Sequence, residues 1–258
     1  MTVNREPWSG WPALVALVAI STGLEVASRA GLVSGLLFPP PSQVLATLAG
    51  SLANGEMIDH LIATLGRMIP GLVIGAIPGL TLGLLMGRSR RLRRVVDPFV
   101  AAFHPVPKIA LLPVFMLLLG IGEASKIAIV ALAAFFPCLI NAMAGARGIS
   151  PLYLEVARSY GASPFRTFTR VLLPASLPVA LSGLRLAANV TIVVTIAIEL
   201  VAADRGLGSL VWLSWEILRV DLLYATILVT AGLGIGLNSL LAWVSRRVAP
   251  WAFVPPRH

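Results

Sequence analysis

Long apolar runs recur along almost the whole chain, and they limit what it can fold into more than any other feature. A helix that crosses a bilayer needs about 20 mostly apolar residues. Runs of this kind lie at 11–28, 61–86, 98–119, 125–145, 176–201 and 222–245. With 57% hydrophobic and only 12% charged residues, a chain of 258 residues is not a soluble globular domain. We predict an all-α integral membrane protein, a single domain over residues 1–258 with about six spans.

The net charge of +9 is unevenly distributed along the chain. Arginines gather after the second, fourth and sixth runs, at Arg88, Arg90, Arg91, Arg93, Arg94, Arg147, Arg158, Arg166, Arg170, Arg246, Arg247 and Arg257. Basic loops stay on the cytosolic side of a membrane, so this pattern predicts that both termini are cytosolic and agrees with an even number of spans. We interpret the arginines as topology signals rather than as a nucleic-acid or lipid site.

The first and third runs differ from the others. The first is longer than the apolar part of a signal peptide and has no A-x-A-like site after it, so we expect an uncleaved helix. The third is interrupted between Pro105 and Pro113, which favours a broken span whose freed carbonyls must find donors in the protein or in water. Asp97 and Pro98 resemble a cap and a first helical residue, so we predict that this span starts there.

The second run carries a glycine at every fourth position, at Gly71, Gly75, Gly79, Gly83 and Gly87. Four residues advance a helix by about 400°, so successive glycines lie about 40° apart and form a slowly winding groove. Another backbone can approach closely along such a groove. We interpret it as a packing surface for a neighbouring span in a tight bundle.

The sequence lacks the motifs of a catalytic or metal site. The two lysines, Lys108 and Lys126, each precede isoleucine, so no G-x-x-x-x-G-K-S/T phosphate loop exists. The three histidines are scattered, and the single Cys138 has no partner at metal-ligand spacing. We therefore expect no enzymatic activity, no metal and no cofactor bound by this chain.

The fifth run contains three polar residues, Arg185, Asn189 and Glu199. At about 100° per residue, Asn189 lies about +40° and Glu199 about −40° from Arg185, so the three share one face of the helix. Charged residues within a bilayer usually have a partner or a function. Two interpretations stay open: the face lines a solute pathway, or Arg185 and Glu199 reach towards the two membrane interfaces. Lys108 and His104, near the break in the third run, are further candidates for the pathway.

The longest polar interruption is the segment 150–174, within a cytosolic loop of about 147–175, between the fourth and fifth runs. Ser150 and Pro151 form a start signal for one helix, Gly161 a stop signal with a left-handed turn, and Ser163 with Pro164 a second start signal. We predict a helix–turn–helix. Such an ordered loop in a membrane protein indicates a docking element for another protein, and an amphipathic loop resting on the membrane surface is the alternative.

Seven positions in this loop form a pattern: Glu155, Val156, Ala157, Gly161, Val171, Leu173 and Pro174. They resemble the E-A-A-x3-G-x9-I-x-L-P signature of the membrane subunits of ATP-binding-cassette (ABC) importers, with valine at the second position and at the isoleucine position. Further segments are similar to the branch that handles sulfonates, taurine and nitrate: LFPPPSQVL from Leu37, GRSRRLRRVVDP from Gly87, PVPKIALLP from Pro105, FMLLLGIGEASK from Phe115 and GLRLA from Gly183. Together the similar segments are spread over most of the chain.

The resemblance implies the fold of a type I ABC importer permease in the bacterial inner (cytoplasmic) membrane. It implies a second permease copy, commonly identical, two ATPase subunits that bind ATP and Mg²⁺, and an external solute-binding protein. The docking face would include Arg158, Tyr160, Ala162 and Phe165 besides the signature residues. Arg185 favours a small anionic solute such as a sulfonate, taurine or nitrate. Membrane lipid is the remaining expected partner, and nucleic acid is not one.

Two other functions stay open from the sequence. A self-sufficient secondary transporter would use Glu199 and Arg185 to couple an ion to a solute, although the paired broken helices and internal repeats of such carriers are not evident. A membrane anchor would recruit a soluble ATPase without transporting a solute.

Overall fold

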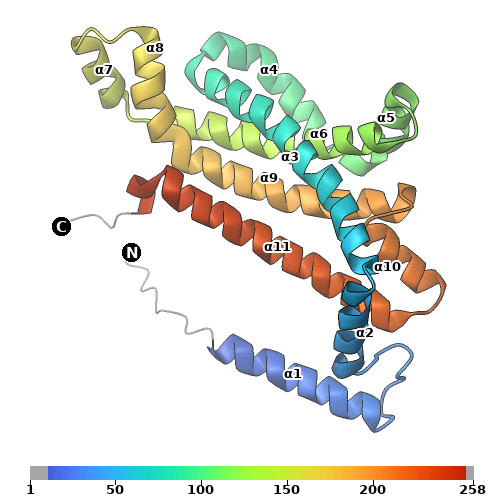
Figure 1. The fold of residues 1–258 in the computed structure, drawn as a ribbon. Helices are drawn as coiled ribbons and strands as arrows, with labels where there is room; N and C mark the ends of the chain where they lie inside the picture. Colours follow the sequence, from blue (N-terminus) through green and yellow to red (C-terminus); the bar gives the residue numbers. More distant parts are fainter. Residues whose placement is uncertain (1–10, 254–258) are drawn as a thin grey trace.

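The structure is a computed structural model that describes residues 11–253, and every regular element in this part of the chain is a helix (Figure 1). The helices are α1 (Trp11–Arg29), α2 (Pro41–Ala53), α3 (Glu56–Arg88), α4 (Arg90–Phe103), α5 (Leu112–Leu119), α6 (Glu123–Arg147), α7 (Pro151–Ser159), α8 (Pro164–Thr167), α9 (Leu173–Ala202), α10 (Leu207–Glu216) and α11 (Val220–Val248). Three short helical segments accompany them: η1 (Lys108–Leu111), the π-helical η2 (Phe168–Leu172) and η3 (Pro250–Phe253).

Between residues 11 and 253, four helical segments are long and apolar enough to cross a membrane: α3, α6, α11 and the continuous element Pro164–Ala202 that includes α9. A fifth candidate is a bent pair, α4 followed by Lys108–Leu119, whose halves meet at 92°. The predicted all-α fold with apolar spans and the broken third span are therefore confirmed. The helix α1 has 19 residues and coincides with the first predicted span, but the total of six stays a prediction. The two chain ends, 1–10 and 254–258, lie outside the described residues.

The centre of the bundle is the contact between α3 and α6, where two main chains come close together. A Cβ added at Gly75 of α3 would collide with the main chain of Ala131 on α6. A Cβ at Gly79 or at Gly83, one and two turns further along α3, would likewise collide with main-chain carbonyls of α6. The predicted packing groove is therefore confirmed, and its partner is α6. Because α9 packs against α6 as well, α3, α6 and α9 form the core of the molecule.

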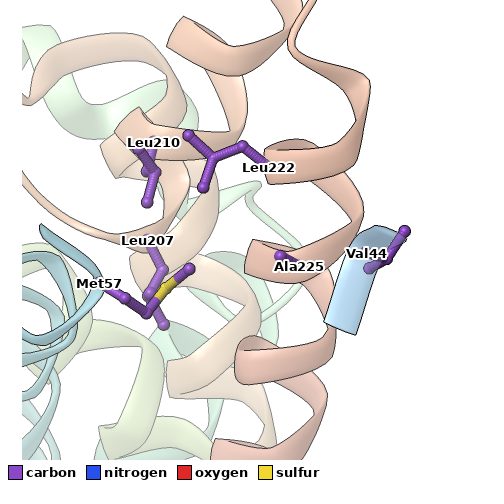
Figure 2. Close-up of a cluster of buried hydrophobic side chains, with 6 residues drawn as sticks. All are labelled: Val44, Met57, Leu207, Leu210, Leu222 and Ala225. Carbon is purple, nitrogen blue, oxygen red and sulfur yellow. The ribbon is translucent and has the colours of Figure 1, made fainter. Parts of the chain in front are cut away.

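The connections between the long helices gather at two opposite ends of the bundle (Figure 1). One end, which we call the loop end, carries α7, α8 and the C-terminal end of α11. The other, which we call the α10 end, carries α2 and α10. Figure 2 shows six buried side chains that hold the α10 end together, Val44, Met57, Leu207, Leu210, Leu222 and Ala225. They come from α2, α3, α10 and α11, so this end is closed by an apolar core of its own.

The bent span starts earlier than the sequence predicted. α4 begins at Arg90, after a cap in which the Ser89 hydroxyl accepts a hydrogen bond from the N–H of Leu92 (3.2 Å). Asp97 and Pro98 lie inside this helix, so the predicted start at these residues is wrong. The helix continues through the proline because its apolar face packs on a buried cluster formed with α3 and α6, and tertiary packing overrides local preference.

The helix α1 stands apart from the core and contacts the rest of the chain mainly through α2 (Figure 1). The Glu25 carboxylate of α1 accepts hydrogen bonds from the N–H (3.0 Å) and the hydroxyl (2.7 Å) of Ser42, near the start of α2. Most α1 side chains, including Leu17 and Ile20, are exposed. An apolar helix with so little cover needs lipid or another protein around it.

Candidate functional site: a docking loop joined to a transmembrane helix

The loop between α6 and α9 folds as the predicted helix–turn–helix. α7 ends in a left-handed turn at Gly161, where φ is +65°, a conformation that costs a residue with a Cβ about 1–2 kcal/mol. The N–H of Ala162 donates to the carbonyl of Ala157 (3.0 Å), and the N–H of Gly161 donates to that of Arg158 (2.9 Å). This pair of bonds is the Schellman motif, which satisfies the last carbonyls of a helix. The predicted stop signal at Gly161 is confirmed.

The two serines that were predicted to cap the loop helices behave differently. The Ser163 hydroxyl accepts a hydrogen bond from the N–H of Arg166 (3.3 Å), so this serine caps α8 as predicted. Ser150 occupies the corresponding position before α7 but makes no side-chain cap bond. The N–H of Tyr153 donates to the main-chain carbonyl of Ser150 instead (3.1 Å). The helix start at Ser150 is confirmed, and the side-chain cap there is wrong.

The loop continues into the fifth span without a break. α8 passes through η2 into α9, so that Pro164–Ala202 is one continuous helical element. Leu173 and Pro174, the last residues of the signature, are the first residues of α9. Leu172 beside them is buried against α3 and α6 and anchors the joint to the core. A displacement of the loop therefore acts directly on the span.

Exposed apolar side chains cluster on the loop: Leu152, Tyr153, Val156, Tyr160 and Phe165. Tyr160 is 87% and Phe165 75% exposed, whereas the signature residue Ala157 is buried and supports the turn from within. Glu155 and Arg158 are also exposed, and no ion pair joins them to each other. The loop thus presents apolar area and two charges to whatever lies next to it.

A cavity of about 330 Å³ lies between the loop and the end of α3. Its lining includes Leu154, Arg158 and Phe168 of the loop and Arg88 of α3. Arg88 opens the arginine run that the charge pattern assigns to the same side of the membrane as the loop. The structure brings the run and the loop to the same end of the bundle, as that pattern requires.

The pathway candidates Arg185 and Asn189 both lie where α9 faces α11. Arg185 lines a cavity of about 220 Å³ together with Ser245 of α11, and its buried Nε finds no hydrogen-bond partner in the described part of the chain. The side-chain oxygen of Asn189 accepts a hydrogen bond from the amide of Asn238 on α11 (2.6 Å). The structure brings these two candidates to one side of the helix. Their role in a pathway stays a prediction.

Glu199 lies elsewhere, in a buried polar network at the α10 end. Its side chain is 0% exposed, and one carboxylate oxygen accepts a hydrogen bond from Nη1 of Arg67 on α3 (2.7 Å). The other oxygen accepts from the hydroxyl of Thr64 (2.9 Å) and the N–H of Gly208 (3.0 Å). The shared helix face therefore does not bring Glu199 and Arg185 to a common surface in this conformation.

Arg67 is the residue that sequence reasoning missed. Its side chain is 5% exposed and pairs with two carboxylates, that of Glu199 on α9 and that of Glu123 at the start of α6. A signal was present, because Arg67 is the one charged residue in the apolar run 61–86. A charge inside a span needs a partner, and Glu199 needs one by the same rule.

Lys108 closes the break in the third span. Its ammonium donates to the carbonyls of Phe103, His104 and Val106, at 3.0, 2.8 and 2.7 Å. It also lies 4.8 Å from the ring centre of Phe136 on α6. The donors that the freed carbonyls were expected to need are thus supplied by a side chain. His104 is exposed at the end of α4, and a pathway role for either residue stays a prediction.

The described residues offer little for a bound metal ion. Within residues 11–253, no group of three or more His, Cys, Asp or Glu side chains is arranged to hold one. Cys138 is buried in α6 as a free thiol.

Comparison with protein families gives the class of the protein. Residues 79–250 match the model of the binding-protein-dependent transport system inner membrane component. The chain belongs to this family. The match includes the docking loop and the helices on both sides of it, from the middle of α3 to the end of α11.

Individual relatives agree with the family. The chain is 37% identical over 225 residues to the taurine transport system permease protein of Escherichia coli, and the match covers 85% of this chain and 82% of that protein. It is 31% identical over 243 residues to the putative aliphatic sulfonates transport permease protein of Bacillus subtilis, covering 94% and 88%. The resemblance to ABC permeases of the sulfonate and taurine branch is confirmed.

A solved structure shares the fold. The methionine ABC transporter MetNI in an inward-facing conformation has a TM-score of 0.67 to this chain, covering 74% of it and 95% of the compared chain. At 21% sequence identity, this likeness shows the fold alone.

Proposed function

We propose that this chain is the transmembrane permease subunit of an ABC importer that moves a small anionic solute into the cytosol. Membership of the binding-protein-dependent family supports the class. The names of two relatives, a taurine permease and a putative aliphatic sulfonates permease, make a sulfonate the first solute to test. Energy would come from separate ATPase subunits that bind ATP and Mg²⁺, because the sequence contains no phosphate-binding loop.

The observation that carries the proposal is the geometry of the loop 150–174. Exposed apolar area of this kind favours a protein partner, and the turn at Gly161 holds it in a fixed shape. We infer that an ATPase subunit docks on Glu155, Val156, Arg158, Tyr160, Gly161, Ala162 and Phe165, while the buried Ala157 supports this surface from beneath. Closure of the ATPase would then pull on α9 through Leu173 and Pro174, since the helix is continuous from the loop onwards.

We infer an assembly of two permease copies, two ATPase subunits and an external solute-binding protein in the bacterial inner membrane. The helix α1 would be the sixth span, with its exposed apolar side chains facing lipid or the second copy. Both termini, the arginine run 88–94 and the docking loop would lie in the cytosol. The α10 end would then face outwards, towards the solute-binding protein.

Arg185 and Asn189 are the residues that we assign to the solute pathway. The Nε of Arg185 has no hydrogen-bond partner among residues 11–253, and a guanidinium suits a sulfonate or another oxyanion. Lys108 and His104 stay weaker candidates. A secondary transporter that couples an ion through Glu199 gains no support, because both oxygens of that carboxylate are already occupied by donors.

The test is reconstitution with the ATPase and the solute-binding protein encoded by neighbouring reading frames. The ATPase should copurify with this chain, and proteoliposomes should take up taurine or another sulfonate only with ATP and the loaded binding protein. Uptake driven by an ion gradient without the ATPase would overturn the proposal in favour of a secondary transporter. Binding of the ATPase without uptake of any solute would leave the anchor function.

A further inference from the structure

Four charged side chains join three spans at the α10 end. Arg67 of α3 donates to both carboxylate oxygens of Glu123 on α6 (2.6 and 2.9 Å) and to Glu199 on α9 (2.7 Å). Lys126, one turn into α6, lies 3.3 Å from Glu123. Arg67, Lys126 and Glu199 are buried, and the Glu123 side chain is 56% exposed. The two positive and two negative charges balance, so the cluster buries no net charge.

Uncharged groups extend this network to the turn between α9 and α10. The N–H of Leu207 donates to the hydroxyl of Thr64 on α3 (2.8 Å), and the N–H of Gly208 donates to Glu199 (3.0 Å). Gly206 has φ +135°, and a Cβ there would collide with the carboxylate of Glu199. The turn is therefore shaped around the carboxylate rather than packed beside it by chance.

The network adjoins the apolar cluster of Figure 2, and the side chains of Arg67 and Glu199 are almost fully removed from water. Leu207, whose N–H belongs to the network, has its side chain in that cluster with Met57 of α3. Exclusion of water strengthens charge interactions, because the local dielectric constant is far below that of bulk water. The ends of α3 and α9 are thus joined by polar and apolar contacts at the same place.

Glu199 fixes α9 at the α10 end of the bundle. The same helical element begins in the docking loop, at the loop end. From Pro164 to Glu199 the chain is one uninterrupted helical element, which bends where α8 passes into α9 (Figure 1). A displacement of the loop therefore reaches the α10 end through this continuous helix. What moves at that end depends on whether α9 is free there or fixed to α3 and α6.

We propose that Arg67 is a positioning residue whose pairing with Glu199 and Glu123 makes the α10 ends of α3, α6 and α9 move as one unit. This inference rests on the proposed docking of an ATPase at the loop, where the displacement begins. With the network intact, the displacement turns all three helices together and opens or closes the α10 end. Without it, α9 shifts alone, and ATP is hydrolysed with little transport of solute.

The first variant removes the charges of Arg67 and Glu199 but keeps the hydrogen bonds that position 199 accepts from neutral donors. In Arg67→Met with Glu199→Gln, the glutamine can still accept from Thr64 and Gly208, while Glu123 and Lys126 keep each other as partners. Replacement of a whole buried pair by neutral groups of similar volume often leaves stability unchanged. We expect a folded chain with bound ATPase subunits and uptake per ATP hydrolysed that falls about fivefold or more.

A second measurement does not depend on transport. Spin labels at Ile58 of α3 and Val201 of α9, both exposed near the α10 end, report the distance between the two helices in a Cys138→Ser background. In the full chain with ATPase subunits in nanodiscs, the wild-type distribution should stay narrow with and without ATP. The double variant should broaden it.

Equal distributions in the wild type and the double variant would overturn the inference whatever the uptake assay gives. Failure of the ATPase to copurify with the wild type would count against the proposed function instead, and the distance measurement would still decide the role of Arg67. If the double variant does not fold, Arg67→Lys takes its place, because a lysine keeps the charge but cannot hold both carboxylates in a fork. Arg219→Met, which removes an exposed arginine at the same end but outside the network, is the matched control and should keep wild-type uptake per ATP.

Discussion

The loop end and the α10 end of this bundle are built in opposite ways. At the loop end, apolar side chains such as Tyr160 and Phe165 stand exposed, and Glu155 and Arg158 do not pair with each other. At the α10 end, charges such as Glu199 are buried and fully paired beside an apolar core. The loop end offers unpaired charges and apolar area to a partner, whereas the buried charges of the α10 end hold its own helices together. We take the contrast to mean that a partner acts at the loop end while the α10 end preserves the arrangement of the helices.

The largest effect should come from Glu199→Ala, which removes one member of the buried ion pair at the α10 end. The change leaves the half-exposed Glu123 and the main-chain carbonyl of Arg205 as the partners of Arg67, and loss of one member of a buried pair costs about 3–5 kcal/mol. Thermal or denaturant unfolding of the purified chain in nanodiscs measures the loss. Glu199→Gln, which keeps acceptors for Thr64 and Gly208, should lose less. A free energy of unfolding within about 0.5 kcal/mol of wild type in the alanine variant would contradict the buried pair.

At the loop end, Gly161→Asp should leave membrane insertion and stability intact and reduce the stimulation of ATP hydrolysis by about tenfold or more. A Cβ is disfavoured at φ +65°, and the turn carries the docking surface. Hydrolysis by the reconstituted complex, with and without loaded binding protein, is the measurement. Gly161→Asn has the same shape without the charge and tolerates a left-handed turn, so it should keep more stimulation. Unchanged stimulation in the aspartate variant would refute the role of the loop as a lever.

Between the two ends, Arg185→Ala should reduce solute uptake about fivefold, the effect of losing roughly 1 kcal/mol from a charge contact in a hydrated path. The ATPase subunits should stay bound, because Arg185 lies outside the docking loop. Uptake and copurification are measured on the same preparation. Arg219→Ala removes an exposed arginine at the α10 end and serves as control. Full transport in the Arg185 variant would remove this residue from the pathway.

The smallest effect should come from Ser163→Ala, which removes the cap of α8. Loss of such a cap costs about 0.5–1 kcal/mol, so the amides at the start of α8 should exchange about two to five times faster with deuterated water. Hydrogen exchange measured by mass spectrometry follows this change. Ser150→Ala is the matched control, because Ser150 makes no side-chain cap bond. Equal changes in the two variants would show that the bond at Ser163 does not stabilise the loop.

Local patterns predicted the features that depend on neighbours in the sequence. The glycine spacing in α3 predicted a close helix contact, and the residues around Gly161 predicted the turn, because a packing groove and a helix stop are encoded within a few turns of chain. The broken third span followed from its prolines in the same way. The local pattern gave the wrong start for α4, because that start depends on burial of the helix against α3 and α6.

Features that join distant parts of the chain could be predicted only in outline. The sequence indicated that Glu199 needs a partner but not that Arg67 supplies it, since the two residues are 132 positions apart. Helical periodicity also does not predict which neighbouring helix, α3 or α11, covers a given residue of α9. The shared face of Arg185, Asn189 and Glu199 was correct as geometry, but different neighbours cover it along the helix.

Because α3 and α6 approach each other closely, the surface between them cannot contact lipid, unlike the exposed faces of other helices. Where two main chains touch, no acyl tail can enter between them. The apolar stretch of α11 has no fully buried residue, and most α1 side chains are exposed, so hydrocarbon or a neighbouring protein meets the outer faces of both helices directly. A change in membrane thickness would therefore tilt α1 and α11 first and leave the α3–α6 pair at its original angle.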